Sequence, residues 1–198
     1  MTSILKVDTI QDVDGNNIIN ESGNTITIGA SGDTTNIIGT LQNDGAAVGG
    51  NNSPSFRAEV ASAQSISDAT ATVIGFGTET FDNGSCYDGT NKFTVPSGEA
   101  GKYVVYSQCN LNPSDLNYAS NLSLYLYKNG SRWTIAKTDF RNNTGSSSTI
   151  IVQDTMDLSV GDYIEVYAQG NTSDGGTLNV FDNGGSTLFS WFQGFKLT

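Results

Sequence analysis

The first quarter of this chain lacks aromatic residues. All eight Tyr, nine Phe and two Trp of the 198-residue sequence lie after residue 55. Aromatic side chains bring the largest apolar area per residue and dominate ordinary protein cores. The segment before residue 55 therefore cannot build a conventional globular core, whereas the remainder can. We predict a thin, repetitive β stalk over residues 1–48, a linker over residues 49–54 and a β-rich head over residues 55–198.

Histidine is absent from the sequence, and cysteine is scarce. The absence of histidine excludes Ser-His-Asp and Cys-His nucleophiles and every His-ligated zinc or iron site. The two cysteines, Cys86 and Cys109, are too few for a disulfide scaffold. The favoured interpretation is two small, partly buried hydrophobic side chains in a reducing compartment, and a disulfide between them is the alternative. We expect that the protein is not an enzyme.

Basic residues and long apolar runs are also few. Nine Lys and Arg stand against twenty Asp and Glu, which gives a formal net charge of −11. Because such a charge repels phosphate backbones, we expect no nucleic-acid partner. No run approaches the roughly 20 apolar residues that a membrane span needs, and the start lacks the features of a secretory signal. These absences predict that the protein does not insert into a membrane. They also predict that it is assembled in a cytoplasm.

Short apolar groups separated by turn sequences fill the N-terminal segment. The stretch SILKVDTIQD alternates in a period of two, which predicts a short strand. Isoleucine pairs then recur between Gly, Asn and Asp turns, as in the rungs of a β-solenoid. Each rung is too small to bury its own pair, so we predict several chains around one axis with Ile26, Ile28 and Ile37 inward. A disordered, low-complexity leader is the alternative.

The remainder of the sequence predicts strands and no helix. Alternating residues indicate strands over 102–110, 122–127, 149–158, 163–168 and 187–197. Asn129-Gly130 predicts a hairpin turn after the second of these strands. In the last strand, Trp191 and Phe195 share one face and Phe192 lies on the other. Many short strands with regularly spaced turns indicate an all-β sandwich or jelly roll.

The order of motifs over residues 54–198 resembles a known family. The motifs are PSFRA at 54–58, NGSCYD at 83–88, KFTVP at 92–96, GKYVV at 101–105, LYLYKNG at 124–130, LSVGDYIEV at 158–166 and SWFQGFKL at 190–197. Their succession resembles the globular heads of the complement C1q and tumour-necrosis-factor superfamily. The resemblance implies a ten-stranded jelly roll that forms a compact homotrimer. It also implies that Trp191, Phe192 and Phe195 belong to the trimer core, where three terminal strands meet at an axis.

The N-terminal sequence carries a second resemblance. SILKVDTIQD, followed by GNNIIN and NTITIGASGD, is similar to the leader of fibre proteins of tailed phages, especially those of marine bacteria. Together with a trimeric head, this predicts a phage virion structural protein assembled in the host cytoplasm. Ile4, Leu5, Val7 and Ile10 would anchor the fibre to other virion proteins. The head would contact a glycan or protein of the host surface and so mediate adsorption.

Loops rich in Asp and Asn are the candidate ligand contacts of the head. Their oxygen atoms suit hydrogen bonds to sugars, and they also suit calcium, although the sequence holds no specific calcium motif and we expect no cofactor. The candidate residues are Asp115, Asn117, Tyr118, Asn171, Asp174 and Asp182. The alternative is that these loops are ordinary solvated turns, which select the same residue types.

Two other functions remain open at this point. The first is capsid decoration or a head fibre without a receptor role. The second is a fibre enzyme that trims surface polysaccharide. An acidic β protein offers carboxylate pairs at many spacings, as glycoside hydrolysis requires, but nothing in the sequence singles out one pair.

Overall fold

The computed structural model describes residues 38–39, 41–43, 46–47, 52–114, 119–140, 144–182 and 190–197. The chain divides into two compact units, Met1–Gly49 and Gly50–Thr198. In the first unit, strands β1 (Gln42–Asn43) and β2 (Ala46–Ala47) pair antiparallel. The predicted anchor residues Ile4, Leu5, Val7 and Ile10 and the predicted stalk residues Ile26, Ile28 and Ile37 lie outside the described residues.

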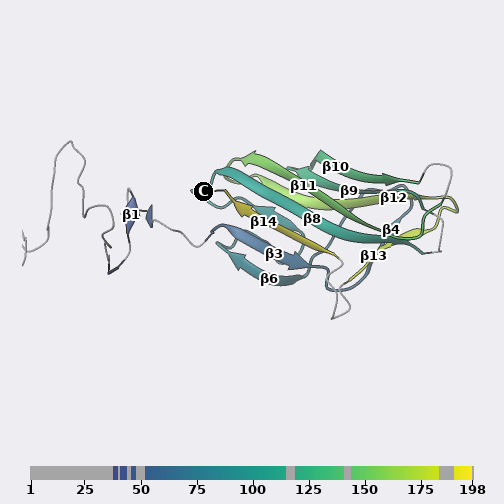
Figure 1. Ribbon diagram of the computed structural model, residues 1–198, viewed down its shortest axis with the longest axis horizontal. Coiled ribbons are helices and arrows are strands. Elements are labelled where there is room, and N and C mark those ends of the chain that lie inside the picture. Colours follow the sequence, from purple (N-terminus) through teal and green to yellow (C-terminus); the bar gives the residue numbers. More distant parts are fainter. Residues whose placement is uncertain are drawn as a thin grey trace, which may run out of the picture. The chain divides into compact units, whose positions relative to one another are not determined.

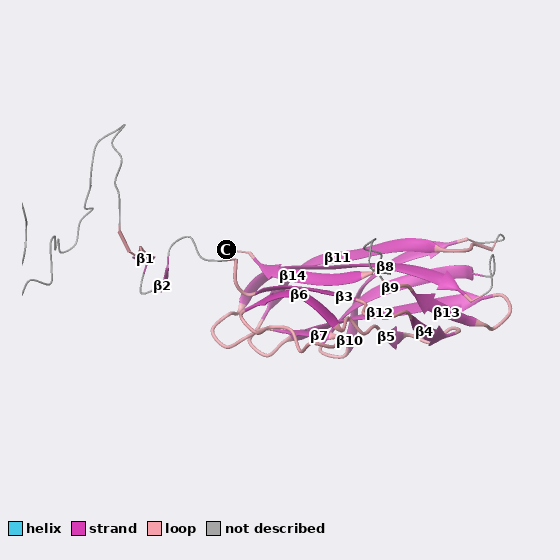
Figure 2. Cartoon of the chain, turned by 90° about the horizontal axis from the view of Figure 1, so that it is seen from below, coloured by secondary structure: helices cyan, strands magenta, loops and turns pink. Residues whose placement is uncertain are grey.

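The second unit consists of two antiparallel sheets packed face to face (Figures 1 and 2). The five-stranded sheet contains β10 (Ser131–Asp139), β9 (Ala119–Lys128), β12 (Tyr163–Thr172), β5 (Thr72–Val73) and β7 (Lys92–Thr94). The seven-stranded sheet contains β4 (Gln64–Ser67), β13 (Thr177–Val180), β8 (Gly101–Pro113), β14 (Trp191–Lys196), β3 (Ser55–Glu59), β6 (Thr78–Asn83) and β11 (Ser148–Leu158). The predicted all-β sandwich is confirmed. Among the described residues, no helix is long and apolar enough to span a membrane.

The described part of the head has twelve strands, β3–β14, rather than ten. The difference arises because short strands follow one another along a single edge of a longer one. β5 and β7 both pair with β12, through Val73 opposite Tyr167 and Phe93 opposite Ile164. In the same way, β14 and β13 pair with successive stretches of β8. The layered architecture is unchanged by these interruptions.

Side-chain alternation places the core between the sheets, as the sequence predicts. In β8, Tyr103, Val105 and Ser107 are buried while their neighbours point outward. In β9, the inward row is Leu122, Leu124 and Leu126. Successive side chains of a strand point to opposite faces, so one apolar row per strand fills the space between the sheets.

Stacked aromatic rings form the centre of the core. The Phe56 ring lies 5.1 Å from the Tyr87 ring and 5.1 Å from the Phe93 ring, and it meets Phe192 edge-on at 4.8 Å. Phe192 has no exposed surface. The prediction that Phe192 packs in the trimer core is therefore wrong, because the alternation of β14 directs it into the interior of its own chain. Trp191 and Phe195 point the other way and remain half-buried.

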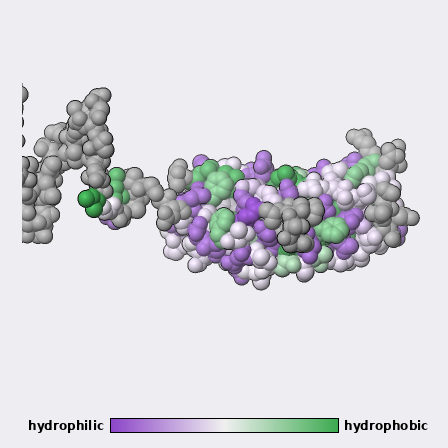
Figure 3. Space-filling view, turned by 60° about the horizontal axis from the view of Figure 1, so that its bottom comes forward, coloured by the Kyte–Doolittle hydropathy of each residue, from purple (hydrophilic) through white to green (hydrophobic). Residues whose placement is uncertain are grey.

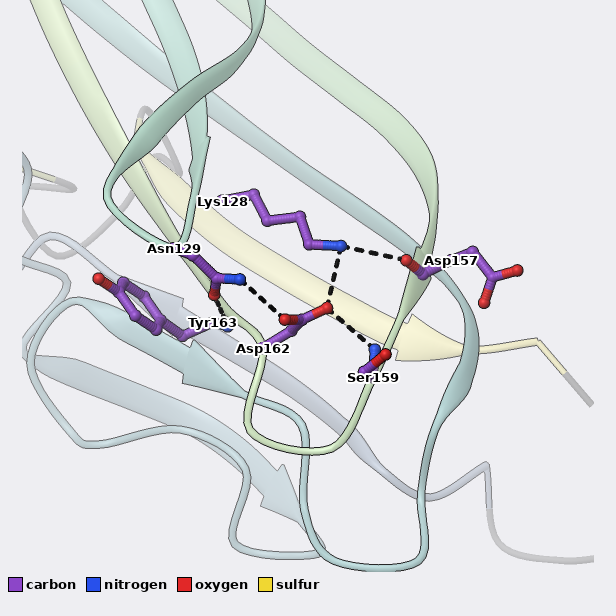
Figure 4. A network of polar contacts seen from close by, with 6 residues as sticks. All are labelled: Lys128, Asn129, Asp157, Ser159, Asp162 and Tyr163. Carbon is purple, nitrogen blue, oxygen red and sulfur yellow. Dashed lines mark hydrogen bonds and ion pairs between the residues drawn. The ribbon is translucent and has the colours of Figure 1, made fainter.

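A polar network joins two turns at one end of the sandwich (Figure 4). Asn129 and Gly130, with φ of 52° and 74°, form the hairpin turn between β9 and β10, and both positive values suit a type I′ turn. Asn129 Nδ2 donates to Asp162 Oδ1 at 2.8 Å, and Tyr163 N donates to Asn129 Oδ1 at 2.9 Å. The hairpin of one strand pair is thus fastened to the turn between β11 and β12.

Asp162 is the acceptor on which this network converges. In addition to the hydrogen bond from Asn129, it accepts one from Ser159 N at 2.9 Å. It also forms an ion pair with Lys128, whose Nζ lies 2.9 Å from Oδ2. The bond from Asn129, the bond from the Ser159 backbone and the bond from Lys128 all favour the charged form and lower the pKa of Asp162 to about 2. The carboxylate therefore stays charged well into the acid range.

The first prediction concerns the acid stability of this network. A folded pKa below the ordinary value means that the stabilisation is complete above the unfolded pKa of about 3.9 and is lost as the pH falls towards 2. We expect Asp162→Asn to lower the free energy of unfolding by about 1 kcal/mol at pH 6 and by much less near pH 2. Denaturant unfolding of both proteins between pH 2 and pH 6 measures the difference.

Asp157→Asn is the matched control for this comparison. The Asp157 side chain is 76% exposed and pairs with Lys102, itself 65% exposed, so its removal should change little at any pH. A difference between Asp162→Asn and wild type that stays constant from pH 2 to pH 6 would contradict a role for the Asp162 charge.

Candidate binding surfaces

Two of the predicted ligand loops follow β8 and β12 in the sequence, and we call the end of β8 at Pro113 the apex. Ser114 N, just after β8, donates to Thr177 O at 2.8 Å, so the apex adjoins the start of β13. Asp115, Asn117 and Tyr118 belong to the first loop and lie outside the described residues. Asp174 belongs to the second loop, and Asn171 lies just before it in the sequence, near the end of β12.

The apical loop between β12 and β13 is held by its own polar contacts. Asp174 Oδ1 accepts a hydrogen bond from Gly176 N at 3.0 Å, and the Asn171 carbonyl accepts one from Ser120 Oγ at 3.0 Å. Asn171 remains exposed. A surface side chain on a fixed backbone is available for contacts with a ligand.

Asp68 contributes to the apex although the sequence did not indicate it. Its Oδ1 accepts hydrogen bonds from Thr172 N at 2.6 Å and from Thr172 Oγ1 at 3.0 Å. These bonds fasten the turn after β4 to the end of β12. The only signal in the sequence is a Ser-Asp pair before a short turn. This pair does not indicate that Asp68 contacts the distant Thr172.

Asp182 lies apart from the other candidate residues. It follows β13, which runs back from the apex, and the adjacent Phe181 N donates to Asn110 O at 3.0 Å. The structure therefore brings the 171–175 loop and the end of β8 together but does not bring Asp182 to them.

The described residues offer neither a metal cluster nor a reactive thiol. No group of three or more Asp, Glu or Cys side chains among them is arranged to hold a metal ion. Cys86 and Cys109 are free and buried, as the favoured interpretation of the sequence has it. Burial raises the pKa of Cys86, and burial raises the pKa of Cys109 to about 12. Both thiols are therefore held in the unreactive protonated form.

The outer face of the seven-stranded sheet carries an aromatic and polar cluster, which we call the association face. It comprises Arg57, Glu59, Tyr106, Trp191, Gln193 and Phe195. Strand register brings them together: Trp191 lies opposite Glu59, and Gln193 lies between Arg57 and Tyr106. All six side chains are half-buried.

The charges of the association face are neutralised within the chain. Arg57 lies 4.7 Å above the Trp191 ring and donates through Nη1 to Gln193 Oε1 at 2.6 Å. Its Nε also lies 3.7 Å from Glu59 Oε1. Tyr106 meets the Trp191 ring at 5.2 Å in a T-shaped contact. A neighbouring molecule could therefore cover this face without leaving a buried charge unpaired.

Apolar side chains continue this surface on both sides. Phe81, opposite Arg57, is 42% exposed, and Ile151, opposite Gln108, is 53% exposed. A hollow on β8 and β11 is lined by Val104, Gln153, Asp154 and Thr155. In the view of Figure 3, hydrophobic residues of the head stand in small groups among hydrophilic ones.

The outer face of the five-stranded sheet carries a second cluster, which we call the tyrosine face. It comprises Lys92, Tyr125, Tyr127, Arg132, Tyr163, Glu165 and Tyr167. The sequence predicts that Tyr125 and Tyr127 share a face, and the even spacing of Tyr163 and Tyr167 implies the same for them. That the two pairs lie side by side follows only from the pairing of β9 with β12.

Comparison with known proteins identifies the fold. No protein-family profile matches the sequence, and no curated protein matches it. The globular domain of zebrafish complement 1qA is 14% identical over 73% of this chain and 98% of its own, with a TM-score of 0.49. Murine APRIL, at pH 5.0 and at pH 8.0, is 14% identical over 72% of this chain and 98% of its own, with a TM-score of 0.50. The head therefore has the same fold as murine APRIL, a jelly roll.

Proposed function

We propose that this chain is a non-enzymatic virion structural protein, a homotrimeric phage fibre whose head binds a receptor on the host surface. The association face is the observation that carries the proposal. It presents Trp191, Phe195 and Tyr106 on one face of the seven-stranded sheet, and aromatic residues and arginine are enriched in protein interfaces. The resemblance of residues 54–198 to the C1q and tumour-necrosis-factor superfamily implies three copies.

The position of the chain ends supports a role in presenting the apex. Lys196 N, near the C terminus, donates to Pro54 O at 3.1 Å, so the entry to the head and its last strand adjoin. Leu197 N also donates to Lys102 O at 2.8 Å, at the start of β8. Both ends of the head thus lie opposite the apex. A fibre attached through residues before 54 would project Asn171 and Asp174 outward.

The phage setting is supported by the N-terminal sequence. Ile4, Leu5, Val7 and Ile10 lie in a stretch that is similar to the leader of phage fibre proteins. Three heads per fibre and many fibres per particle would convert weak apical contacts into durable attachment, because linked sites raise the effective concentration of the second contact.

The second prediction tests self-association. We expect the full-length protein to sediment as a trimer at micromolar concentration and Trp191→Ala to dissociate it, because the change removes the central ring of the association face. Trp133→Ala is the matched control: Trp133 is 54% exposed and lies on β10, outside that face. Sedimentation velocity measures all three proteins. A monomeric wild type, or equal dissociation of both variants, would contradict the proposed interface.

The third prediction tests the receptor role. Host cells incubated with the full-length protein should adsorb fewer virions, in a dose-dependent way, because the free fibre occupies the receptor. The Trp191→Ala protein should need at least about tenfold more material for the same effect, since a monomer lacks avidity. Unchanged adsorption at a saturating dose would favour decoration without a receptor role. Release of glycan fragments from host polysaccharide would instead favour an enzyme.

A further inference from the structure

The tyrosine face is an ordered surface with no role in the proposed trimer contact. Tyr125 lies directly opposite Tyr167 across β9 and β12, and Tyr127 lies opposite Glu165. The rings of Tyr127 and Tyr167 stack at 4.0 Å, and those of Tyr125 and Tyr127 meet edge-on at 6.2 Å. Such contacts fix the rings before any ligand arrives, which lowers the entropic cost of binding.

Two cationic side chains flank the tyrosines on opposite sides. The Arg132 guanidinium lies 4.7 Å from the centre of the Tyr125 ring, and Lys92 Nζ lies 4.7 Å from that of Tyr163. No ion pair joins either cation to a carboxylate in the part of the chain that the structure describes. By contrast, Lys137 on the same sheet pairs with Asp139 at 3.6 Å. Arg132 and Lys92 therefore keep hydrogen-bond donors available to an external anion.

Tyrosine hydroxyl groups, which can form hydrogen bonds with the uncharged polar atoms of a ligand, lie between the two cations. Tyr125 is buried and its Oη donates to Gln169 Oε1 at 2.7 Å, whereas Tyr127, Tyr163 and Tyr167 are half-buried and accessible to a ligand. Burial, first of all, and then the neighbouring Glu165 raise the pKa of Tyr167, so its hydroxyl stays protonated and able to donate. Tyrosine combines an apolar ring with a polar tip, which suits ligands that carry both kinds of surface.

We propose that the tyrosine face binds a polysaccharide that contains uronic acids. The inference rests on the proposed function, in which the head recognises a host surface, and it names a ligand class and a second contact region beside the apex. Arg132 and Lys92 would each hold a sugar carboxylate through charge-assisted hydrogen bonds. The half-buried Tyr127, Tyr163 and Tyr167 would contact the pyranose rings and hydroxyl groups.

Charge complementarity selects this ligand over a neutral one. The chain as a whole is acidic, with a net charge of −11, but the Debye length at physiological salt is about 8 Å. Distant carboxylates are therefore screened. On the face itself, Glu165 lies opposite both Lys92 and Tyr127, so two cations stand against one carboxylate and the local charge stays positive. A carboxylated sugar meets two donors there, whereas a neutral sugar would cover Arg132 and Lys92 and leave them without an anion.

The experiment measures binding of oligogalacturonate to the full-length protein by calorimetry in 150 mM salt. We expect binding by wild type and a loss of affinity of about tenfold or more for Lys92→Gln and for Arg132→Gln, since each removes a charge-assisted hydrogen bond. Lys102→Gln is the matched control, because it removes the same charge from the other sheet. Maltoheptaose, a neutral oligosaccharide, should bind at least about tenfold more weakly than oligogalacturonate.

Three results would overturn the inference. The first is that the wild-type protein does not bind oligogalacturonate. The second is that it binds maltoheptaose as tightly as oligogalacturonate. The third is that Lys92→Gln, Arg132→Gln and Lys102→Gln all bind oligogalacturonate with the same affinity. Tight binding of dextran sulfate that all three variants weaken equally would show general charge attraction and would also overturn it. Sedimentation of the same samples separates the two proposals: a trimer that ignores oligogalacturonate contradicts this inference alone, and a monomer contradicts the proposed assembly.

Discussion

The two-sided alternation of β8 is the constraint on which the head depends. Its inward side chains, such as Tyr103 and Val105, lie in the core, while its outward Tyr106 lies in the association face. β8 pairs with β11 along one edge and with β14 and then β13 along the other. A shift of one residue in this register would exchange the two faces, exposing the core row and burying the polar one. The stability of the sandwich and the composition of its proposed interface are therefore determined by the same pairing.

The two sheets have different outer faces, and the difference suggests separate tasks. On the seven-stranded sheet, Arg57 is neutralised by Glu59 and Gln193, so the face can be covered by another protein without an unpaired charge. On the five-stranded sheet, Arg132 rests on a tyrosine ring and forms none of the ion pairs found among the described residues. Such a face suits a ligand that brings its own charge. One jelly roll can thus use one sheet for assembly and leave the other open for recognition.

The sequence predicted the strands and the fold well, because alternation and turn chemistry are local. The rows of β8 and β9 and the Asn129-Gly130 turn follow from neighbouring residues alone. Phe192 was misplaced because the amount of apolar area near the C terminus does not say which of two apolar faces meets the core. The tyrosine face and the contact of Asp68 with Thr172 could not be predicted, since both depend on which strands pair, and pairing links residues far apart in the chain.

The proximity of the two ends of the head has a mechanical consequence. β3 starts at Ser55, beside Phe195 of β14, and runs from there toward the apex between β14 and β6. If the apex is held by a surface and the chain is pulled from residue 54, the load acts along the length of β3. The hydrogen bonds to both neighbouring strands would then resist together in shear, rather than breaking one at a time as in a peeled hairpin. We expect such a head to withstand drag on a tethered particle better than one that is pulled across its strands.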